Sequence, residues 1–441
     1  MLNSKLSFLQ IFVLLAIFVY SWELEGYFRY KLPFGSFRLY QFVFAVPIAA
    51  YLVDKLLKFK FAVPRFSLSI IIWGIFMILF IPNSLHLGNA VNYAFYIWFD
   101  IFAMLAIIAF FKTEKQIQIL ITVYIVQAVF QSILVIGQFI LFHLGIDTSV
   151  QNPFLGILPR VSGFTTEPSH FSDYTLVCFF VITILKEYCS SLFSRRFLNY
   201  SFWLVFVALI ISTSRFGIAI ALAWVVFRNF IRKENSERKI VKVLLCLFIL
   251  GFIYITFEEE ISIIFDGMNM VAAMEENRHA SAGVRSDVAL KMLQTFSDNP
   301  IVGTSLGGVD PYLARLHGNP YYTPEHNGNA CGDYGEWGGD CGGGSAFAEV
   351  LAASGVVAFP FFLVFWIDLL KKPITAIRNL SWQHSIVIKA LLWGLGILFL
   401  KHIVSPGTHS IHNWVHYGIL MASFFVYRKG TMQRNLSEEL K

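Results

Sequence analysis

The sequence predicts an all-α protein that crosses a membrane many times. Of its 441 residues, 56% are apolar and only 14% are charged, and the mean hydropathy is +0.63. Soluble globular proteins are about 45–50% apolar and about 25% charged. The apolar residues are gathered into stretches long enough to cross a bilayer core of roughly 30 Å as helices. These observations exclude a soluble enzyme, a disordered chain and a nucleic-acid-binding domain.

Twelve apolar stretches are expected to be transmembrane helices. They lie at about residues 6–22, 38–54, 66–82, 90–111, 116–144, 170–186, 199–212, 215–230, 240–257, 345–370, 386–403 and 409–427. The first is expected to be retained, because Trp22-Glu23-Leu24-Glu25 follows it without a small-residue cleavage pattern. The chain then divides into spans one to nine at 1–257, a large outer loop at 258–344, and spans ten to twelve with a tail at 345–441. A shorter outer loop covers 145–169.

Basic residues are distributed unequally between the two sides of the membrane. With the N-terminus inside, 24 of the 34 Lys and Arg residues fall in inner segments and 10 in outer ones, four of these in the long loop. Because short cytoplasmic loops carry an excess of Lys and Arg, both termini are expected in the cytoplasm. The net charge of +6 is interpreted as this bias.

Spans seven and eight are expected to form a short helical hairpin. Between Arg196 and Arg228 the only charged residue is Arg215. One long helix would place Arg215 in mid-bilayer and move the next basic cluster outside. Two helices of about 15 residues, joined at 212–215, keep that cluster inside and are each roughly 22 Å long. The tip of the hairpin is therefore expected below the outer membrane surface.

The outer segment 160–172 is the first candidate site. Thr166 is a plausible helix N-cap, Pro168 suits a first helical turn, and the charge of Glu167 complements the helix dipole. A well-capped helix with an interfacial arginine would account for these residues. In the functional interpretation, Arg160 binds an anion and Glu167 acts as a base or a positioning group.

The hairpin tip is the second candidate site. Ser214 is expected to cap the helix that begins at Arg215. A helix N-terminus attracts anions, and an arginine there adds to the same field. A buried arginine is costly unless it faces a polar cavity or a partner. Anion binding and snorkelling to the interface are both compatible with the sequence.

Three single residues are weaker candidates. Arg285 opens an expected helix at about 280–296, after which the Gly- and Pro-rich loop is expected to be irregular. A surface arginine is the simpler interpretation there. His326 in the long loop could act as a general base near neutral pH. Asp100 lies in the middle of the fourth span, where an acid is either functional or a hydrogen-bonded structural residue.

Two cysteines lie ten residues apart in the long loop, Cys331 and Cys341. A disulfide between them is allowed in an oxidising compartment and would stabilise the loop by roughly 3 kcal/mol. The acidic residues nearby do not have the spacing of an EF-hand, so no metal site is expected.

Together these segments resemble the O-antigen polymerase and O-antigen ligase superfamily of bacterial glycan assembly. Four features, in the order that the family shows them, carry the resemblance. They are Arg160…Gly163…Glu167-Pro168-Ser169; Ser212-Thr-Ser-Arg215-Phe-Gly217; Arg285-Ser-Asp-Val-Ala-Leu with Asn299-Pro-Ile-Val-Gly303 and Gly307-Gly308; and His326-Asn327 with Phe347…Gly355. The similarity covers about residues 155–365. It departs from the family at 328–344, which intervene between the His-Asn pair and the next helix.

The resemblance implies a GT-C-like, metal-independent glycosyltransferase without a cofactor, in the inner membrane with its active site facing the periplasm. Its donor would be an undecaprenyl-diphosphate-linked glycan. Arg160, Arg215 and Arg285 would hold the diphosphate and stabilise the charge of the leaving group. His326 or Glu167 would accept the proton of the attacking hydroxyl. By analogy, the anomeric carbon would be inverted.

Three functions follow as alternatives. A polymerase joins lipid-linked repeats and is implied to work with a chain-length regulator protein, and the Glu-Pro-Ser element resembles polymerases more closely. A ligase transfers the finished glycan to the lipid A core. A transporter or flippase of the same glycan would suit Asp100, but we find no internal repeat, and polar residues gather outside the expected spans. Membrane lipid surrounds the protein in each case, and no nucleic acid is expected as a partner.

Overall fold

The computed structural model describes most of the chain. The described residues are 6–23, 27–32, 35–58, 63–85, 87–146, 151–154, 158–165, 167–188, 192–231, 281–316, 345–404 and 410–439. Within a few described helices and strands, including the segments around Arg160, Arg215 and Arg285, only the backbone is described.

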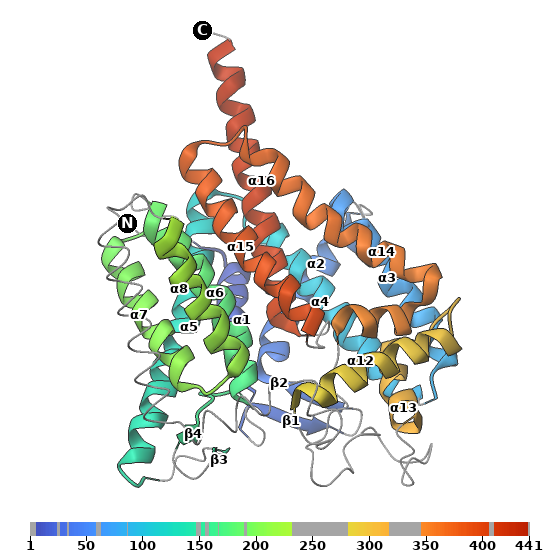
Figure 1. Cartoon of the computed structure of the whole chain (residues 1–441). Helices are drawn as coiled ribbons and strands as arrows, with labels where there is room; N and C mark the ends of the chain where they lie inside the picture. The colour runs from blue at the N-terminus through green and yellow to red at the C-terminus, as the bar shows by residue number, and fades with distance from the viewer. Residues whose placement is uncertain are drawn as a thin grey trace.

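Helices make up nearly all of this structure (Figure 1). They are α1 (Phe8–Val19), α2 (Leu39–Leu57), α3 (Leu68–Leu79), α4 (Leu87–Phe110), α5 (Glu114–His143), α6 (Pro168–Tyr188), α7 (Arg195–Ile211), α8 (Arg215–Ile231), α12 (Ser281–Asp298), α13 (Leu306–Leu316), α14 (Ala346–Ile377), α15 (Trp382–Val404) and α16 (Ile411–Glu439), with 3₁₀ turns η1 (Arg65–Ser67) and η2 (Ile81–Asn83). Eleven of the twelve expected spans overlap with one of these helices, and the stretch at 240–257 lies outside the described residues.

Six helices in the described part of the chain are long and apolar enough to cross a membrane: α2, α4, α5, α6, α14 and α15. Shorter apolar helices occur at Phe8–Val19, Arg65–Leu79 and Gly217–Arg228. The all-α, multi-pass membrane character is thus supported, whereas twelve spans and their orientation stay predictions.

Two small antiparallel hairpins were not expected. Strand β1 (Arg29–Leu32) pairs with β2 (Gly35–Arg38), and β3 (Gln151–Phe154) pairs with β4 (Leu158–Arg160). Both lie in segments that we expected to be outer loops. A pair of strands satisfies its backbone groups locally, so it is compatible with a short polar connection between helices. We call the end of the bundle that carries them the hairpin end; it lies at the bottom of Figure 1, opposite the end of α16.

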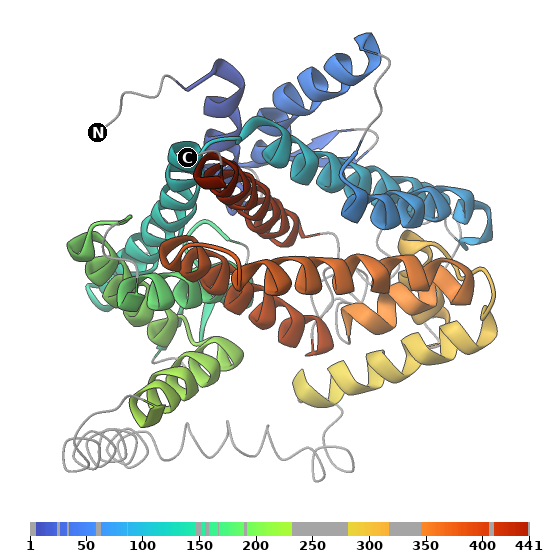
Figure 2. The same cartoon turned by 90° about the horizontal axis from the view of Figure 1, so that it is seen from above.

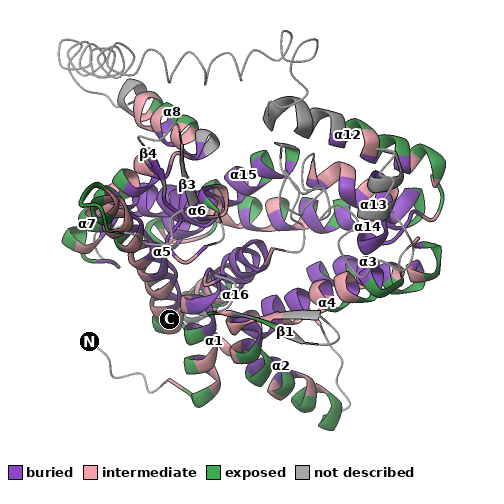
Figure 3. Cartoon of the chain, turned by 90° about the horizontal axis from the view of Figure 1, so that it is seen from below, coloured by how far each residue is buried: buried purple, intermediate pink, exposed green. Residues whose placement is uncertain are grey.

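Helices far apart in the sequence pack side by side. Helix α6 packs along α15, α16 along α4, and α14 along α3. Seen along the bundle, α15 and α16 lie near its middle (Figure 2), and their surfaces are largely buried (Figure 3). The first half of α16 is buried almost throughout, which places a histidine-containing helix in the interior.

The predicted break between spans seven and eight is confirmed. Helix α7 ends at Ile211 and α8 begins at Arg215, with Thr213 between them at a φ of +58°. Ser214 is the residue before α8, where the cap was expected, and its hydroxyl donates to Ser172 Oγ of α6 at 2.9 Å. At the far end, Arg228 forms an ion pair with Glu187 at 2.6 Å. Helix α8 is thus held against α6 at both of its ends.

The glycine-rich segment after α12 is joined to α14 by backbone hydrogen bonds. The N–H groups of Thr304 and Ser305 donate to the carbonyls of Ala352 and Ala353, and that of Val356 donates to Pro300. Helix α14 is interrupted there by Gly355, at a φ of +58°. This break frees main-chain groups of α14 for the pairing, which we call the glycine joint (300–305 with 352–357).

A second helix, α13, follows the glycine joint where irregular chain was expected. Its sequence contains Gly307 and Gly308, which normally disfavour a helix. A Cβ at Gly307 would collide with the backbone of Asn89, and one at Gly308 would crowd Ser84. The glycines therefore let α13 lie directly on the start of α4, and this packing outweighs their low helix propensity.

The glycine joint yields a stability prediction. Replacing Gly303, which has a φ of +71°, by alanine would bring a Cβ into the carbonyl of Ala353. The backbone conformation alone costs an L-residue about 1–2 kcal/mol. We expect Gly303→Ala to lower the unfolding temperature of the detergent-solubilised protein clearly.

Gly396→Ala is the matched control, because a Cβ on this glycine of α15 would meet nothing within 4 Å. Alanine is favoured over glycine inside a helix by about 0.5–1 kcal/mol, so this variant should be as stable as wild type or more stable. Equal unfolding temperatures for Gly303→Ala and wild type would show that the joint does not depend on this glycine.

Candidate functional site

A tight turn at 162–165 leads into α6 at the hairpin end. Gly163 adopts a φ of +65° and lies so close to Gln131 of α5 that a Cβ would not fit. Its N–H donates to Gln138 Oε1 at 2.9 Å, and the N–H of Phe164 donates to Gln131 Oε1 at 3.0 Å. The first predicted motif is therefore fixed to α5 through glutamine side chains. The backbone conformation and close packing of this turn explain why a glycine stands at position 163.

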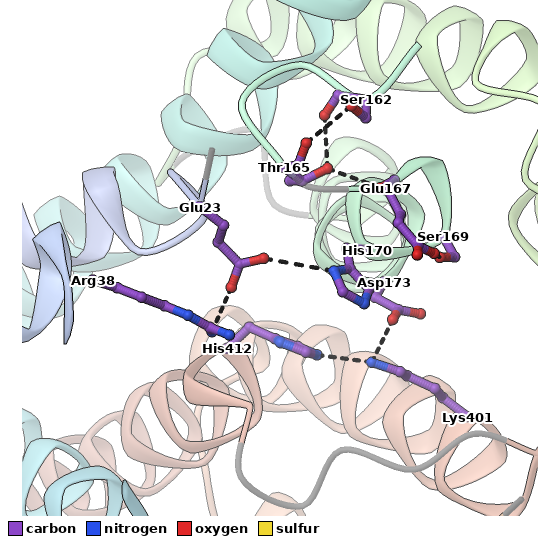
Figure 4. A network of polar contacts seen from close by, with 10 residues as sticks. All are labelled: Glu23, Arg38, Ser162, Thr165, Glu167, Ser169, His170, Asp173, Lys401 and His412. Atoms are coloured by element: carbon purple, nitrogen blue, oxygen red, sulfur yellow. Dashed lines mark hydrogen bonds and ion pairs between the residues drawn. The ribbon is translucent and has the colours of Figure 1, made fainter. Parts of the chain in front are cut away.

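The same turn positions Glu23 just after α1. The N–H of Glu23 donates to the carbonyl of Phe164 at 2.9 Å, and the Phe164 ring packs against Trp22 with 5.3 Å between centroids. Glu23 Oε1 lies 2.6 Å from Arg38 Nη1 at the start of α2, and Glu23 Oε2 lies 3.7 Å from His170 Nδ1 in the first turn of α6 (Figure 4). Three segments distant in sequence thus meet at one carboxylate.

Glu23 is held in its charged form. Its side chain is only 3% exposed, and this burial would raise its pKa. The charges of Arg38 and His170 and their hydrogen bonds outweigh burial and lower the pKa of Glu23 to about 2. Glu23 is consequently an anion at any physiological pH, next to a partly exposed imidazole.

A second set of charges lies on the other side of His170. Asp173 Oδ2 of α6 lies 2.7 Å from Lys401 Nζ near the end of α15, and Lys401 Nζ lies 3.2 Å from His412 Nε2 in α16. The Lys401 side chain is 4% exposed. The His412 ring stacks edge-on against Tyr174, one residue after Asp173, with 4.6 Å between centroids. We call Glu23, Arg38, His170, Asp173, Lys401 and His412 the charge cluster (Figure 4).

The two predicted motifs of spans six to eight meet next to the charge cluster. Ser172 of α6 accepts the hydrogen bond of Ser214, and Gly217 of α8 is packed against the Ser172 side chain so closely that a Cβ would collide. The backbone of Arg215 therefore lies beside the first turns of α6. The sequence predicted both motifs as sites, and the structure brings them together at the hairpin end.

The predicted proton acceptors and arginines are placed as follows. Glu167 precedes α6 with an exposed side chain whose Oε2 accepts a hydrogen bond of 2.9 Å from Ser169. Arg160 ends β4, Arg215 begins α8, and Arg285 lies in the first turns of α12, which begins near the end of α15 in Figures 1 and 2. The side chains of these three arginines are not among those described, so their common role stays a prediction.

Three further predicted residues, His326, Cys331 and Cys341, lie outside the described part of the chain. Asp100 is buried in the middle of α4, and its Oδ2 has no hydrogen-bond partner among the described residues. Asp100 has no hydrogen bond to the charge cluster, but the charge of Arg38, a member of that cluster, acts on it. No hydrogen bond among the described residues makes it a satisfied structural acid.

The members of the charge cluster were missed by sequence reasoning. Asp173 and Lys401 fall inside the expected spans 170–186 and 386–403, where an ionisable residue is a functional hypothesis by default. Asp173 and Lys401 were therefore predictable from the sequence on the same grounds as Asp100. Glu23 and Arg38 lie at the ends of expected spans, and no local pattern predicts that they face one another.

The charge cluster gathers acids, cations and imidazoles in an apolar bundle. Charges buried in low dielectric need partners, and such groups in membrane proteins mark substrate or proton sites more often than they add stability. Among the described residues no group of three or more His, Cys, Asp or Glu side chains is arranged to hold a metal ion. Each cation of the cluster is already paired with a carboxylate, and the imidazole of His170 is left partly exposed, which is suited to moving a proton.

Comparison with known proteins supports the superfamily resemblance. Residues 200–363 match the model of a protein family described as O-Antigen ligase. This match supports the O-antigen ligase and polymerase superfamily and covers the region from α7 into α14, including the glycine joint. The α6, α15 and α16 members of the charge cluster lie outside the matched region. No curated protein matches the chain.

The charge cluster yields a prediction about one ion pair. Lys401→Met leaves Asp173 nearly buried without its cation, and removing one partner of a buried pair costs about 3–5 kcal/mol. We expect a large fall in the unfolding temperature in detergent. The double variant Lys401→Met/Asp173→Leu should recover most of it, because no charge is left unpaired.

The exposed pair Lys58–Asp54 at the other end of the bundle is the control. Exposed pairs contribute about 0–1 kcal/mol, so Lys58→Met should leave the unfolding temperature almost unchanged. If the single Lys401 variant proves as stable as the double variant, the pair is not a buried one in solution.

Proposed function

We propose that the protein is a membrane glycosyltransferase that joins lipid-diphosphate-linked oligosaccharide repeats into O-antigen or a related surface polysaccharide. The observation that carries this proposal is the contact of Ser214 with Ser172, which brings two motifs of the superfamily together at one end of the bundle. The family match over α7, α8, α12, α13 and the start of α14 supports the reaction class.

The proposed donor is an undecaprenyl-diphosphate-linked glycan whose headgroup lies at the hairpin end, on the periplasmic face of the inner membrane. Arg160, Arg215 and Arg285 hold the diphosphate, because guanidinium groups bind such oxygens in bidentate geometry. The start of α8 adds the free N–H groups of a helix N-terminus. These cations stabilise the charge that develops on the leaving diphosphate without a metal ion.

The attacking group is a sugar hydroxyl of the acceptor. Its oxygen bonds to the anomeric carbon from the face opposite the diphosphate, so the configuration is inverted. The hydroxyl proton passes to a base, for which His326 and Glu167 are the candidates from the sequence. In a polymerase the acceptor is a second lipid-linked repeat, and the proposed protein partner is a chain-length regulator.

A ligase is the second candidate, because the matching family is described as O-Antigen ligase. In that case the acceptor is a sugar of the lipid A core, and the lipid-linked substrate is the finished glycan. The Glu-Pro-Ser element at 167–169 favours the polymerase, since it resembles polymerases more closely.

Deleting the gene in the native host and resolving the surface glycans on a gel tests this proposal. For a polymerase we expect loss of the ladder and a core that carries a single repeat. Wild-type protein should restore the ladder and Arg215→Ala should not, since loss of a group that stabilises a leaving charge costs roughly 100- to 1000-fold in rate.

Arg195→Ala is the control, an exposed arginine at the opposite end of the bundle, and it should restore the ladder when present at the same level. A bare core with long lipid-linked polymer on the outer face would identify a ligase instead. Lipid-linked single repeats trapped on the inner face would refute glycosyl transfer and indicate a flippase.

A further inference from the structure

His170 is the most exposed side chain of the charge cluster. It is 41% exposed, against 30% for Arg38 and 3%, 4% and 15% for Glu23, Lys401 and Asp173. The ring nitrogen Nδ1 faces the carboxylate of Glu23, which Arg38 fixes from the other side. In Figure 4 the imidazole lies between the Glu23–Arg38 pair and the Asp173–Lys401 pair. The opposite ring nitrogen, Nε2, therefore points away from Glu23.

A carboxylate that contacts one nitrogen of an imidazole fixes the ring orientation and stabilises the imidazolium that forms when the other nitrogen takes a proton. Here the carboxylate is itself buried and held by a guanidinium, so it does not compete with the imidazole for the proton. Exposure of His170 then gives a hydroxyl-bearing substrate access to the ring.

We propose that His170 is the catalytic base of the glycosyl transfer, with Glu23 and Arg38 as positioning residues. The inference rests on the proposed function and names the residue that takes the proton. It offers an alternative to the two acceptors expected from the sequence. Glu167 is less suited, because its carboxylate accepts a hydrogen bond from Ser169 and has no buried partner among the described residues.

The proposed reaction is a displacement of the diphosphate at the anomeric carbon of the donor. The acceptor hydroxyl oxygen forms a bond to the anomeric carbon of the donor, and the bond from that carbon to the diphosphate oxygen breaks. The electron pair of the broken bond leaves with the diphosphate, and the hydroxyl proton moves to Nε2 of His170. The imidazolium then releases the proton to water, and no oxidant, reductant or metal ion takes part.

The position of His170 suits a reaction at the end of α6. His170 and Ser172 are two residues apart on a helix, so they point to nearly opposite faces of its first turns. Ser172 faces the start of α8, where the proposed diphosphate ligand Arg215 begins. A donor that lies across the end of α6 has its diphosphate on the α8 side and its anomeric carbon toward an acceptor on the His170 side.

Charged groups surround His170 from every packed element that the structure describes there. Glu23 and Arg38 approach from α1 and α2, Asp173 and Glu167 come from α6 and the segment before it, and Lys401 and His412 come from α15 and α16. Arg215 begins α8 nearby. The three acids favour an imidazolium, and the cations Arg38 and Lys401 oppose it. Removing the charge of Glu23 should therefore ease loss of the imidazole proton.

The test uses purified full-length protein and the lipid-linked glycan extracted from the deletion strain, with the rate of glycan joining measured from pH 5 to 9. For wild type we expect a rate that rises with pH as an imidazole loses its proton. His170→Gln should be slower by about 100- to 10,000-fold, the usual contribution of a general base. It should also lose that rise.

Glu23→Gln distinguishes a positioning role from a purely structural one, because only the former predicts a shifted pH profile. The pH of half-maximal rate should shift downward, because an imidazolium beside an amide loses its proton more readily than one beside a carboxylate. Added imidazole should restore part of the rate of His170→Ala, since it can take the proton in place of the missing side chain.

His143→Gln is the matched control, an exposed histidine at the end of α5 whose ring packs edge-on against Phe139 and Phe142, and it should keep both the rate and the pH profile. A wild-type pH profile in His170→Gln, or a folded His170→Ala that imidazole does not restore, would overturn the role of His170 while glycosyl transfer stands. Absence of glycan joining by wild type would instead refute the proposed function.

Discussion

The cost of burying charge in an apolar bundle organises the hairpin end of this protein. Lys401 is almost fully buried and reaches Asp173 of α6 and His412 of α16 at once. In such surroundings each charge is stable only beside its partner, so the three helices are held in a single register. The same holds for Glu23, which joins the ends of α1 and α2 to α6 through Arg38 and His170. Helix α6 is therefore the common element on which two separate sets of charges converge.

Helix α6 also carries the contacts of α8. Ser172 receives Ser214 at the hairpin end, and Glu187 pairs with Arg228 at the other. Helix α6 therefore faces the charge cluster on one side and the start of α8 on the other. The superfamily match begins only after α6, at residue 200, and it ends within α14. The proposed reaction thus uses residues of the matched region together with charged residues from helices before and after it.

The sequence predicted what depends on local pattern. The length of the apolar stretches located the helices, and the isolated Arg215 predicted the break between α7 and α8. The helix-favouring stretch at about 280–296 predicted α12. The sequence did not predict α13, because Gly307 and Gly308 are compatible with a helix only through their packing on α4. The pairing of Glu23 with Arg38 and of Lys401 with Asp173 was also not predicted, since each depends on which helices become neighbours. The motifs at α6 and α8 were found from the sequence, but their contact was not.

The glycine joint holds two segments of the chain together through their main chains. The segment 300–305 is attached to α14 at 352–357 through main-chain groups, with Gly303 and Gly355 allowing the approach. Side chains on either segment can diverge without loosening this attachment, provided that the two glycines are kept. Natural variants could therefore exchange the connected segments while the membrane helices stay the same. An engineer who grafts such segments between relatives would be advised to cut outside the joint and to transfer both of its halves together.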